Sequence, residues 1–288
     1  MSKVDFHCHS QASDGSLSPQ ALVDLALDKA ISSLAITDHD TTAGYEAVYP
    51  YAQERGLDLI SGVEISALWQ NRTVHIVGLN LAVDNTPLQN MLAAIRRLRW
   101  QRAEDINARL QQRGHPCMAA RLKEIVGQGV VGRPHIAQVL VERQYVTSIN
   151  QAFDKFLKQG RTGFVAANWP ELAEVVASIN GAGGQAVLAH PGKYKLTSRK
   201  LNGLLTDFKL AGGSGLEVVT QKFASSEAIG MADRAKRHQL MASVGSDYHG
   251  PEQTWRQLGA LASLPPDVTP IQQAWLGTDA ASLNAQNL

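Results

Sequence analysis

The sequence predicts an α/β protein with a largely parallel sheet that is interrupted by a helical insert. Up to about residue 85, and again from about residue 171, short apolar segments alternate with amphipathic helical segments. This alternation is typical of parallel sheets whose strands are joined by helices. The segment between these two parts carries helical periodicity only. In parallel sheets of this kind the functional side chains gather at the carboxyl ends of the strands.

The first part of the chain predicts several strands and two helices. Apolar segments predict strands that begin near Val4 and cover 34–37, 58–61, 64–69 and 73–79. Ser18 before Pro19 predicts a helix start, because serine caps free amide groups and proline suits the first helical position. A second helix is expected near 44–55, closed by Gly56. The last two strands are expected to pair as a hairpin through Asn71-Arg72.

The middle of the chain predicts helices, after which the strands resume. A long helix is expected at 87–113, because apolar residues recur there at three- and four-residue intervals with arginines between them. Glycines near 127–132 break the next helical segment. From Glu171 a helix begins, followed by strands at 185–189, 215–219 and 240–244 and a further helix near 201–209.

Composition predicts a cytoplasmic globular protein without a membrane or protein partner. The chain has 288 residues, 44% of them hydrophobic, and no apolar run near the roughly 20 residues that span a bilayer. A strand begins by about Val4, which leaves no room for a signal peptide. The two cysteines, Cys8 and Cys117, lie far apart in sequence, as in proteins from reducing compartments.

Charge is distributed unevenly along the chain. The net charge is only +1, but residues 94–165 carry thirteen Lys/Arg and five Asp/Glu, which is +8. The remainder carries fourteen basic and twenty-one acidic residues, which is −7. The acidic part is suited to cations and the basic part to an anion. We therefore expect residues 1–90 and 168–288 to form the sheet-containing domain and 91–167 a basic helical insert that covers the active site.

Histidines and carboxylates recur at the ends of five predicted strands. One such histidine is more often a structural residue than a ligand, but repetition after five apolar segments favours a polynuclear metal site. His7 and His9 lie two residues apart, so a strand points both to one face. Structural zinc usually uses thiolates, which are scarce here. Nitrogen and oxygen ligands suit manganese, iron or zinc. The residues concerned are His7, His9, Asp14, Asp38, His39, Asp40, Glu64, His75, His190, Asp247 and His249.

These motifs resemble a known family. The strings are DFHCHSQASDGSLSPQALVDLA, LAITDHDTTAGYEA, GVEIS, HIVGLN, AVLAHPGKY and GSDYH. In this order they are similar to the PHP family, named for its polymerase and histidinol-phosphatase members. The basic insert and the HPGKY string look most like the bacterial nucleoside 3′,5′-bisphosphate phosphatases, a group related to 5′-to-3′ exoribonucleases. The resemblance implies a distorted (β/α)₇ barrel with three metal ions at the strand carboxyl ends.

The resemblance also implies how the ligands are shared. The first metal would be held by His7, His9, Glu64 and Asp247. The second would be held by Glu64, His75 and His190, and the third by Asp14, His39 and His249. The metal is expected to be Mn²⁺, with Fe²⁺ or Zn²⁺ as alternatives. Asp38 and Asp40 are expected to support the loops rather than to bind metal.

The chemistry that follows is phosphoester hydrolysis through a metal-bridged hydroxide. Cations bridged by Glu64 lower the pKa of a shared water, so no protein nucleophile is needed. Glu64, Asp247 and His190 are the catalytic residues in this interpretation, acting through that water. The leaving oxygen is protonated by a metal-bound water or by an acid such as Asp247.

The basic insert predicts a substrate with a second phosphate. Gly-flanked loops place Arg133, His135, Lys158 and Arg161 where they can bind it. Lys193 follows the HPG turn and is expected near the scissile phosphate. We therefore expect removal of the 5′-phosphate from nucleoside 3′,5′-bisphosphates and 5′-to-3′ digestion of short or single-stranded 5′-phosphorylated RNA.

Two alternatives remain from the sequence. A histidinol-phosphate phosphatase or another small-molecule phosphatase would share the metal motifs, but histidinol phosphate carries a cationic amine that fits poorly beside arginines. A non-catalytic metal- or nucleotide-binding module is the alternative from a different class. Such modules typically lack ligands, and this chain has every ligand type that the family uses.

Overall fold

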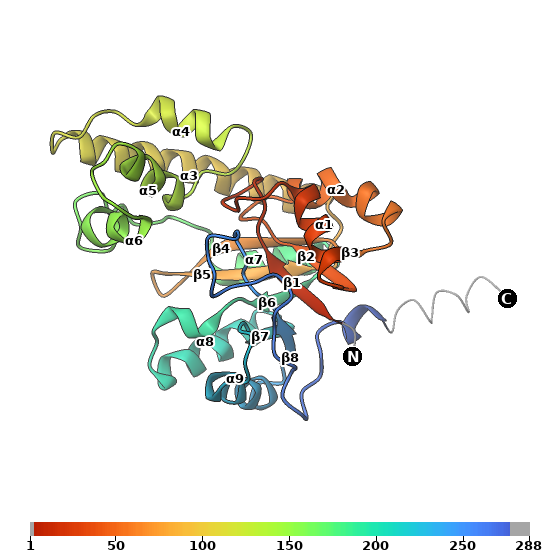
Figure 1. Ribbon diagram of the computed structural model, residues 1–288. Helices are drawn as coiled ribbons and strands as arrows, with labels where there is room; N and C mark the ends of the chain where they lie inside the picture. Colours follow the sequence, from red (N-terminus) through yellow and green to blue (C-terminus); the bar gives the residue numbers. More distant parts are fainter. Residues whose placement is uncertain (1–2, 277–288) are drawn as a thin grey trace.

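The computed structural model describes residues 3–276, and within this range eight strands form two sheets (Figure 1). The smaller sheet has the order β1-β2-β3 and the larger the order β4-β5-β6-β7-β8. The strands are β1 (Val4–Cys8), β2 (Ser33–Ile36), β3 (Asp58–Ile60), β4 (Gly62–Trp69), β5 (Arg72–Leu79), β6 (Gln185–Leu188), β7 (Gly215–Val219) and β8 (Met241–Val244).

The two sheets close on each other as a distorted barrel. An isolated bridge joins Cys8 at the end of β1 to Tyr248 after β8, and another joins His39 after β2 to Glu64 in β4. Most neighbouring strands are parallel, but β5 runs antiparallel to both β4 and β6. The barrel architecture confirms the predicted fold class, and this reversed strand is its main irregularity. The predicted β4–β5 hairpin is also present, but its turn is Gln70-Asn71, both at positive φ, one residue earlier than the predicted Asn71-Arg72, because Arg72 already pairs with Trp69.

Helices pack against both sheets. The chain forms α1 (Pro19–Asp28), α2 (Ala43–Glu54), α3 (Thr86–Gln111), α4 (Ala119–Val126), α5 (Arg133–Glu142), α6 (Ile149–Ala152), α7 (Leu172–Gly181), α8 (Ser198–Leu210) and α9 (Ser226–Arg237). Ser18 caps α1 by accepting a hydrogen bond from the Ala21 amide, as predicted. The helices α1 and α2 share a core with the smaller sheet, whereas α7, α8 and α9 share one with the larger sheet. No helix within 3–276 is long and apolar enough to cross a membrane.

The insert has a hydrophobic core of its own. Figure 1 shows α4, α5 and α6 gathered along α3, on the opposite side of the molecule from α8 and α9. Buried residues from Ala103 to Leu157 form this second core, whereas Leu88, Leu92 and Ile95 of the first half of α3 belong to the main core. This supports the proposed insert at 91–167, with α3 as the element that the two cores share.

Removing a buried side chain from the insert core is expected to destabilise the protein. Leu140 in α5 is fully buried, so Leu140→Ala should lower the free energy of unfolding by about 2–5 kcal/mol through lost burial and a new cavity. Urea denaturation measures this change. Leu210→Ala is the control, because Leu210 is 81% exposed and should change stability by no more than about 0.5 kcal/mol. Equal effects of the two substitutions would contradict the separate core.

Candidate metal centre

The nine residues predicted as metal ligands lie together at one end of the barrel. Three groups have ligand atoms within 4.8 Å of one another: His7, His9, Glu64 and Asp247; His9, Asp14, His39 and His249; and His39, Glu64 and His75. His190 adjoins the third group, with its Nε2 atom 2.8 Å from Glu64 Oε1. Residues from six separate segments of the chain thus converge on one place.

Glu64 is at the centre of this cluster. Its side chain is fully buried, and five imidazole rings approach its two oxygens. The distances are 2.8 Å to His190, 2.9 Å to His39, 3.0 Å to His75, 3.3 Å to His9 and 3.4 Å to His7. A carboxylate in this position can bridge two cations, because each of its oxygens faces a different set of nitrogens.

Two of these residues do not lie where the sequence pattern placed them. Glu64 and His75 were expected at strand ends, but both lie inside strands of the β4–β5 hairpin. For His75 the reason is the reversed direction of β5, which places the first half of this strand beside the carboxyl end of β6. Glu64 lies near the start of β4, where it bridges to His39 after β2. The backbone N–H of His75 also donates a hydrogen bond to the Tyr194 hydroxyl at 2.9 Å.

Glu217 orients two of the predicted ligands and was missed by the sequence analysis. Its Oε1 atom lies 2.6 Å from His7 Nδ1, which leaves His7 Nε2 to face the cluster. Its Oε2 atom accepts the backbone N–H of His190. Gly245 makes room for this arrangement, because a Cβ there would lie 2.3 Å from His7 Cβ and 2.6 Å from Glu217 Oε1. Carboxylates that hold the far nitrogen of a ligand histidine are common around metals.

Other buried carboxylates fix the loops. Asp38 accepts hydrogen bonds from the Ser10 amide and from the hydroxyls of Ser10 and Ser13, which holds the loop after β1. Asp40 accepts the Ser66 amide at 2.7 Å and pairs with Arg99 of α3. Neither carboxylate belongs to the three groups of potential ligands, in agreement with the expectation that both support loops.

The backbone is left-handed at several positions in these loops. His190, Asp247 and Asp40 have φ values of 30°, 51° and 53°. Non-glycine residues rarely adopt such values, and they persist where surrounding contacts enforce them. Here the hydrogen bonds from His190 to Glu217 and from Ser66 to Asp40 supply such contacts.

Burial lowers the pKa values of imidazoles in the cluster, whereas pairing with carboxylates raises them. Burial lowers the pKa of His39 to about 4 and that of His190 to about 3. Burial also acts to lower the pKa of His7, but attraction to Glu217 and Glu64 outweighs it and raises this pKa to about 10. Burial acts to raise the pKa of Glu64, but His39, His75 and His7 hold it well below its usual value. Near neutral pH Glu64 is therefore ionised and His39 and His190 are neutral, which are the forms that bind metals, whereas His7 holds a proton that a bound cation would displace.

Several buried polar atoms of the cluster have no hydrogen-bond partner and could coordinate cations. Asp14 Oδ1, Glu64 Oε2, His39 Nδ1 and His190 Nδ1 are buried without a hydrogen-bond partner. His39 Nδ1 and Glu64 Oε2 lie 2.9 Å apart but are not aligned as a hydrogen bond. Buried polar atoms are rarely left unpaired, so this concentration indicates that cations complete the site. The donor set has no sulfur within the three groups, which suits Mn²⁺, Fe²⁺ or Zn²⁺.

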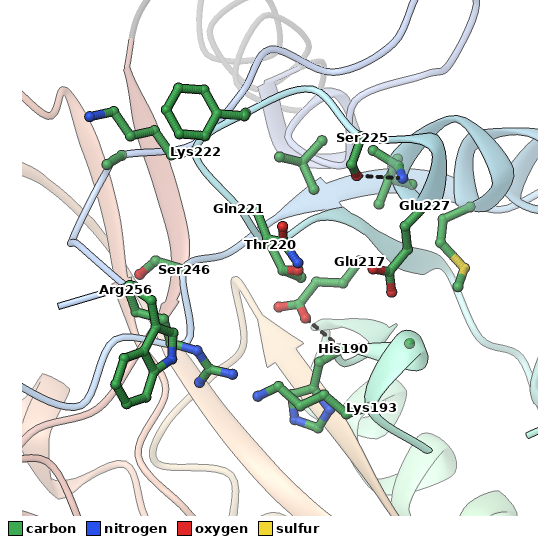
Figure 2. A pocket seen from close by; sticks show the side chains of 18 of the residues that line it. His190, Lys193, Glu217, Thr220, Gln221, Lys222, Ser225, Glu227, Ser246 and Arg256 are labelled. Atoms are coloured by element: carbon green, nitrogen blue, oxygen red, sulfur yellow. Dashed lines mark hydrogen bonds between the residues drawn. The ribbon is translucent and has the colours of Figure 1, made fainter. Parts of the chain in front are cut away.

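Two cations of the protein adjoin the cluster at Asp247. Lys193 forms an ion pair with Asp247 Oδ2, and Arg256 Nη1 lies 2.6 Å from the same oxygen. Figure 2 shows both side chains beside His190. Burial lowers the pKa of Lys193 to about 8, and repulsion by Arg256 adds to this shift. Arg256 was not predicted from the sequence.

A cluster of three arginines lies where the insert meets the barrel. Arg99, Arg102 and Arg133 line one small cavity together with Trp169. The guanidinium groups of Arg99 and Arg102 lie 5.3 and 5.6 Å from the centre of the Trp169 ring. Burial lowers the pKa of Arg102 to about 9 and also that of Arg133, and mutual repulsion contributes in both cases. Only Arg99 has a carboxylate partner, Asp40, among the ion pairs of residues 3–276.

The predicted substrate residues of the insert have different surroundings. Arg133 belongs to the arginine cluster. His135 is buried beside Asp14 and accepts the Gly132 amide at Nδ1, and burial lowers its pKa. Lys158 is exposed and pairs with Asp154, and Arg161 is also exposed. The structure therefore brings His135 close to Asp14 of the metal cluster and places Arg133 beside Arg99, whereas no described contact links Lys158 or Arg161 to the metal cluster.

Comparisons with known proteins agree with this site. The chain is 39% identical over 269 residues to a 5′-3′ exoribonuclease of Haemophilus influenzae, covering 93% of this chain and 97% of that protein. It is 38% identical over 272 residues to a 3′,5′-nucleoside bisphosphate phosphatase of Chromobacterium violaceum, covering 94% and 95%. A solved structure of a Chromobacterium violaceum amidohydrolase with bound sulfate and no metal has a TM-score of 0.88, with 36% identity and 95% of each chain covered.

The family model called PHP domain matches residues 5–166, which is more than half of the chain. That range includes the β1 and β2 loops, the β4–β5 hairpin and the whole arginine-rich insert. Together with relatives that align over nearly the full length, this match confirms the resemblance seen in the motifs. The chain belongs to the PHP domain family.

Proposed function

We propose that this protein is a metal-dependent phosphoesterase with two related activities. It removes the 5′-phosphate from nucleoside 3′,5′-bisphosphates, and it digests short or single-stranded 5′-phosphorylated RNA from the 5′ end. The observation that carries the proposal is the arginine cluster, in which two partly buried guanidinium groups without carboxylate partners are linked through Arg99 and Asp40 to the loops of the metal-ligand cluster. The relatives named as an exoribonuclease and a bisphosphate phosphatase support it.

The metal assignment is part of the proposal. We assign His7, His9, Glu64 and Asp247 to one ion, Glu64, His75 and His190 to a second, and Asp14, His39 and His249 to a third. Mn²⁺ is the expected metal, since nitrogen and oxygen donors without thiolate favour it over metals that prefer sulfur. When bound, the ions supply Lewis acidity and lower the pKa of water, so that the chain itself needs no nucleophile.

The side chains around Asp247 are suited to the scissile phosphate. Lys193 and Arg256 both contact Asp247 Oδ2, so two positive charges adjoin a ligand oxygen at the edge of the cluster. A phosphoryl group that transfers to water carries negative charge on its equatorial oxygens. Fixed cations stabilise this charge without having to reorganise during the reaction. Glu217 keeps His7 and His190 in place through its two hydrogen bonds while negative charge develops on the phosphoryl oxygens.

The arginine cluster is suited to the second phosphate. Arg102 and Arg133 repel each other and Arg99 in a partly buried setting, which costs free energy unless an anion compensates. The cluster is tied to the metal loops by the Arg99–Asp40 ion pair and by the contact of His135 with Asp14. Arginine also matches phosphate geometry with two parallel donors. For Lys158 and Arg161, binding of the second phosphate stays a prediction from the sequence.

The alternatives fit less well. Histidinol phosphate would place a cationic amine near the arginine cluster, where it meets repulsion instead of attraction. A module that only binds metal would not need Lys193 and Arg256 beside Asp247. The relatives that align over nearly the whole chain are also named as enzymes.

Substitution of Glu64 is expected to remove metal. Glu64→Gln takes away the charge that faces five imidazoles, so the purified protein should retain less Mn²⁺ by mass spectrometry of its metal content. Adding Mn²⁺ at 100 times its Kd should stabilise the unsubstituted protein by about 2.7 kcal/mol and raise its Tm, an effect that the variant should largely lose. Glu104→Gln, at an exposed position on α3, is the control. Unchanged metal content in Glu64→Gln would refute the assignment.

The substrate class is tested with the Mn²⁺-loaded protein. Adenosine 3′,5′-bisphosphate should yield inorganic phosphate and adenosine 3′-monophosphate, and 5′-phosphorylated single-stranded RNA should yield mononucleotides, both resolved by ion-exchange chromatography. Adenosine 5′-monophosphate, which lacks the second phosphate, should react with a much lower kcat/KM. Equal turnover of the two nucleotides would argue against a second phosphate site.

The arginine cluster is tested by Arg133→Ala. Loss of a charge-assisted hydrogen bond of about 1.5–3 kcal/mol should lower kcat/KM for adenosine 3′,5′-bisphosphate by about 10- to 150-fold. Turnover of adenosine 5′-monophosphate should hardly change, because that molecule has no second phosphate. Arg143→Ala, at an exposed arginine of the same insert, is the matched control. If Lys158→Ala lowers kcat/KM and Arg133→Ala does not, the second phosphate binds elsewhere in the insert.

A further inference from the structure

A large pocket opens beside the metal cluster, on its β7 side. It has a volume of about 700 Å³ and includes His190, Glu217 and Ser246, so it is continuous with the cluster (Figure 2). Its other walls come from the loop after β7, the start of α9 and the loop after β8. Pockets of about 300–1,000 Å³ are typical of small-molecule sites. The proposed site for the scissile phosphate, at Lys193 and Arg256, uses only one end of this pocket, and the arginine cluster lies outside it.

The electrostatics of this pocket do not favour a second phosphate. Two carboxylates, Glu217 and Glu227, line it. Two of its cations, Lys193 and Arg256, are already held by Asp247 at the end that faces the metal cluster. The third, Lys222, has its Nζ atom 5.6 Å from the centre of the Phe223 ring. Positive and negative side chains are therefore mixed in this pocket, unlike in the arginine cluster, and the mixture suits a neutral polar group better than a second phosphate.

Aromatic side chains are exposed on this pocket. Phe223 and Trp255 are 76% and 73% exposed, and they are the only aromatics among the large hydrophobic residues exposed within 3–276. Both line the same pocket, although they come from different loops. Exposed aromatic faces beside a nucleotide site are suited to stacking with bases.

The neighbouring polar residues can recognise a base edge. Figure 2 shows Gln221 and Thr220 in the middle of the pocket, between Glu217 and Lys222. A glutamine amide both donates and accepts hydrogen bonds, as does a threonine hydroxyl. The Gln221 loop is held in place because its carbonyl accepts the Ala262 amide at 2.9 Å.

We propose that this pocket binds the nucleobase of the nucleotide whose 5′-phosphate is cleaved, with Trp255 and Phe223 as stacking partners. The inference rests on the proposed function and adds a third binding region to it. Trp255 directly precedes Arg256, whose guanidinium pairs with Asp247, so the backbone of Trp255 adjoins a residue that is anchored at the metal cluster. The base then lies on the β7 side of the cluster and the 3′-phosphate on the side of the insert. Because stacking accepts any base, the pocket favours nucleotides over other phosphate esters without strong base selectivity.

The test compares two substrates that differ only in the base. These are adenosine 3′,5′-bisphosphate and its abasic analogue, 1-deoxyribose 3,5-bisphosphate. The double variant Phe223→Ala/Trp255→Ala should lower kcat/KM for the adenosine compound by about 5- to 150-fold, mainly through KM, because stacking on aromatic residues is lost. For the abasic analogue the double variant and the unsubstituted protein should give the same kcat/KM. Leu210→Ala, at an exposed apolar residue of α8, is the matched control.

A binding measurement separates this inference from the proposed function. Adenosine 5′-monophosphate should quench the tryptophan fluorescence of the unsubstituted protein, and this quenching should be largely lost in Trp255→Phe. The result does not depend on hydrolysis. Suppose that both substrates are hydrolysed. The base site is then overturned, and the phosphoesterase proposal stands, if the double variant changes kcat/KM equally for the two substrates or changes neither value. The same conclusion follows if adenosine 5′-monophosphate quenches the fluorescence of Trp255→Phe as strongly as that of the unsubstituted protein. If neither substrate is hydrolysed but the quenching depends on Trp255, the proposed activity fails and the base site stands.

Discussion

The buried carboxylate of Glu64 is the constraint on which the rest of the structure depends. An ionised group without exposure to water is stable only if it is paired, and five imidazoles within 3.4 Å provide the surroundings. These rings come from strands and loops that are distant in sequence, so the barrel has to close for Glu64 to be tolerated. The reversed strand β5 contributes directly, since it carries His75 to the same end of the barrel as the parallel strands.

The sequence predicted the parts of the site that depend on local pattern. A potential metal ligand can be recognised from local sequence alone where an apolar strand ends in His7-x-His9 or Asp38-His39, and also at the HPG turn of His190. Glu217 could not be recognised from local pattern, because it lies inside a strand. Its role is visible only in the folded chain, where β7 lies between β6 and β8 and the Glu217 oxygens reach His7 and His190. The hairpin was predicted, but the direction of its strands relative to the barrel was not.

The insert supports the metal loops as well as adding charge. Arg96 and Arg99 of α3 hydrogen-bond to the carbonyl and carboxylate of Asp40, next to His39. The Val130 amide donates to the Ala12 carbonyl in the loop that carries Asp14. Two of the loops that carry potential ligands therefore contact the insert. Local pattern indicated a basic helical segment, but only the folded chain shows that part of its positive charge is used to hold the barrel loops.

The net charge of +8 over 94–165 overstates the charge that a substrate meets. Arg121 pairs with Glu124 and Glu142, Lys158 pairs with Asp154, and Arg99 pairs with Asp40. Arg102 and Arg133, in the cavity beside Arg99, have no carboxylate partner among the ion pairs of residues 3–276, and their partial burial makes each charge more effective than one on the surface. On the opposite side of the cluster Glu217 and Glu227 line the large pocket. In the binding mode that we propose, this asymmetry orients the nucleotide: its second phosphate is attracted to the arginines, and its neutral base lies in the pocket where carboxylates and cations are mixed.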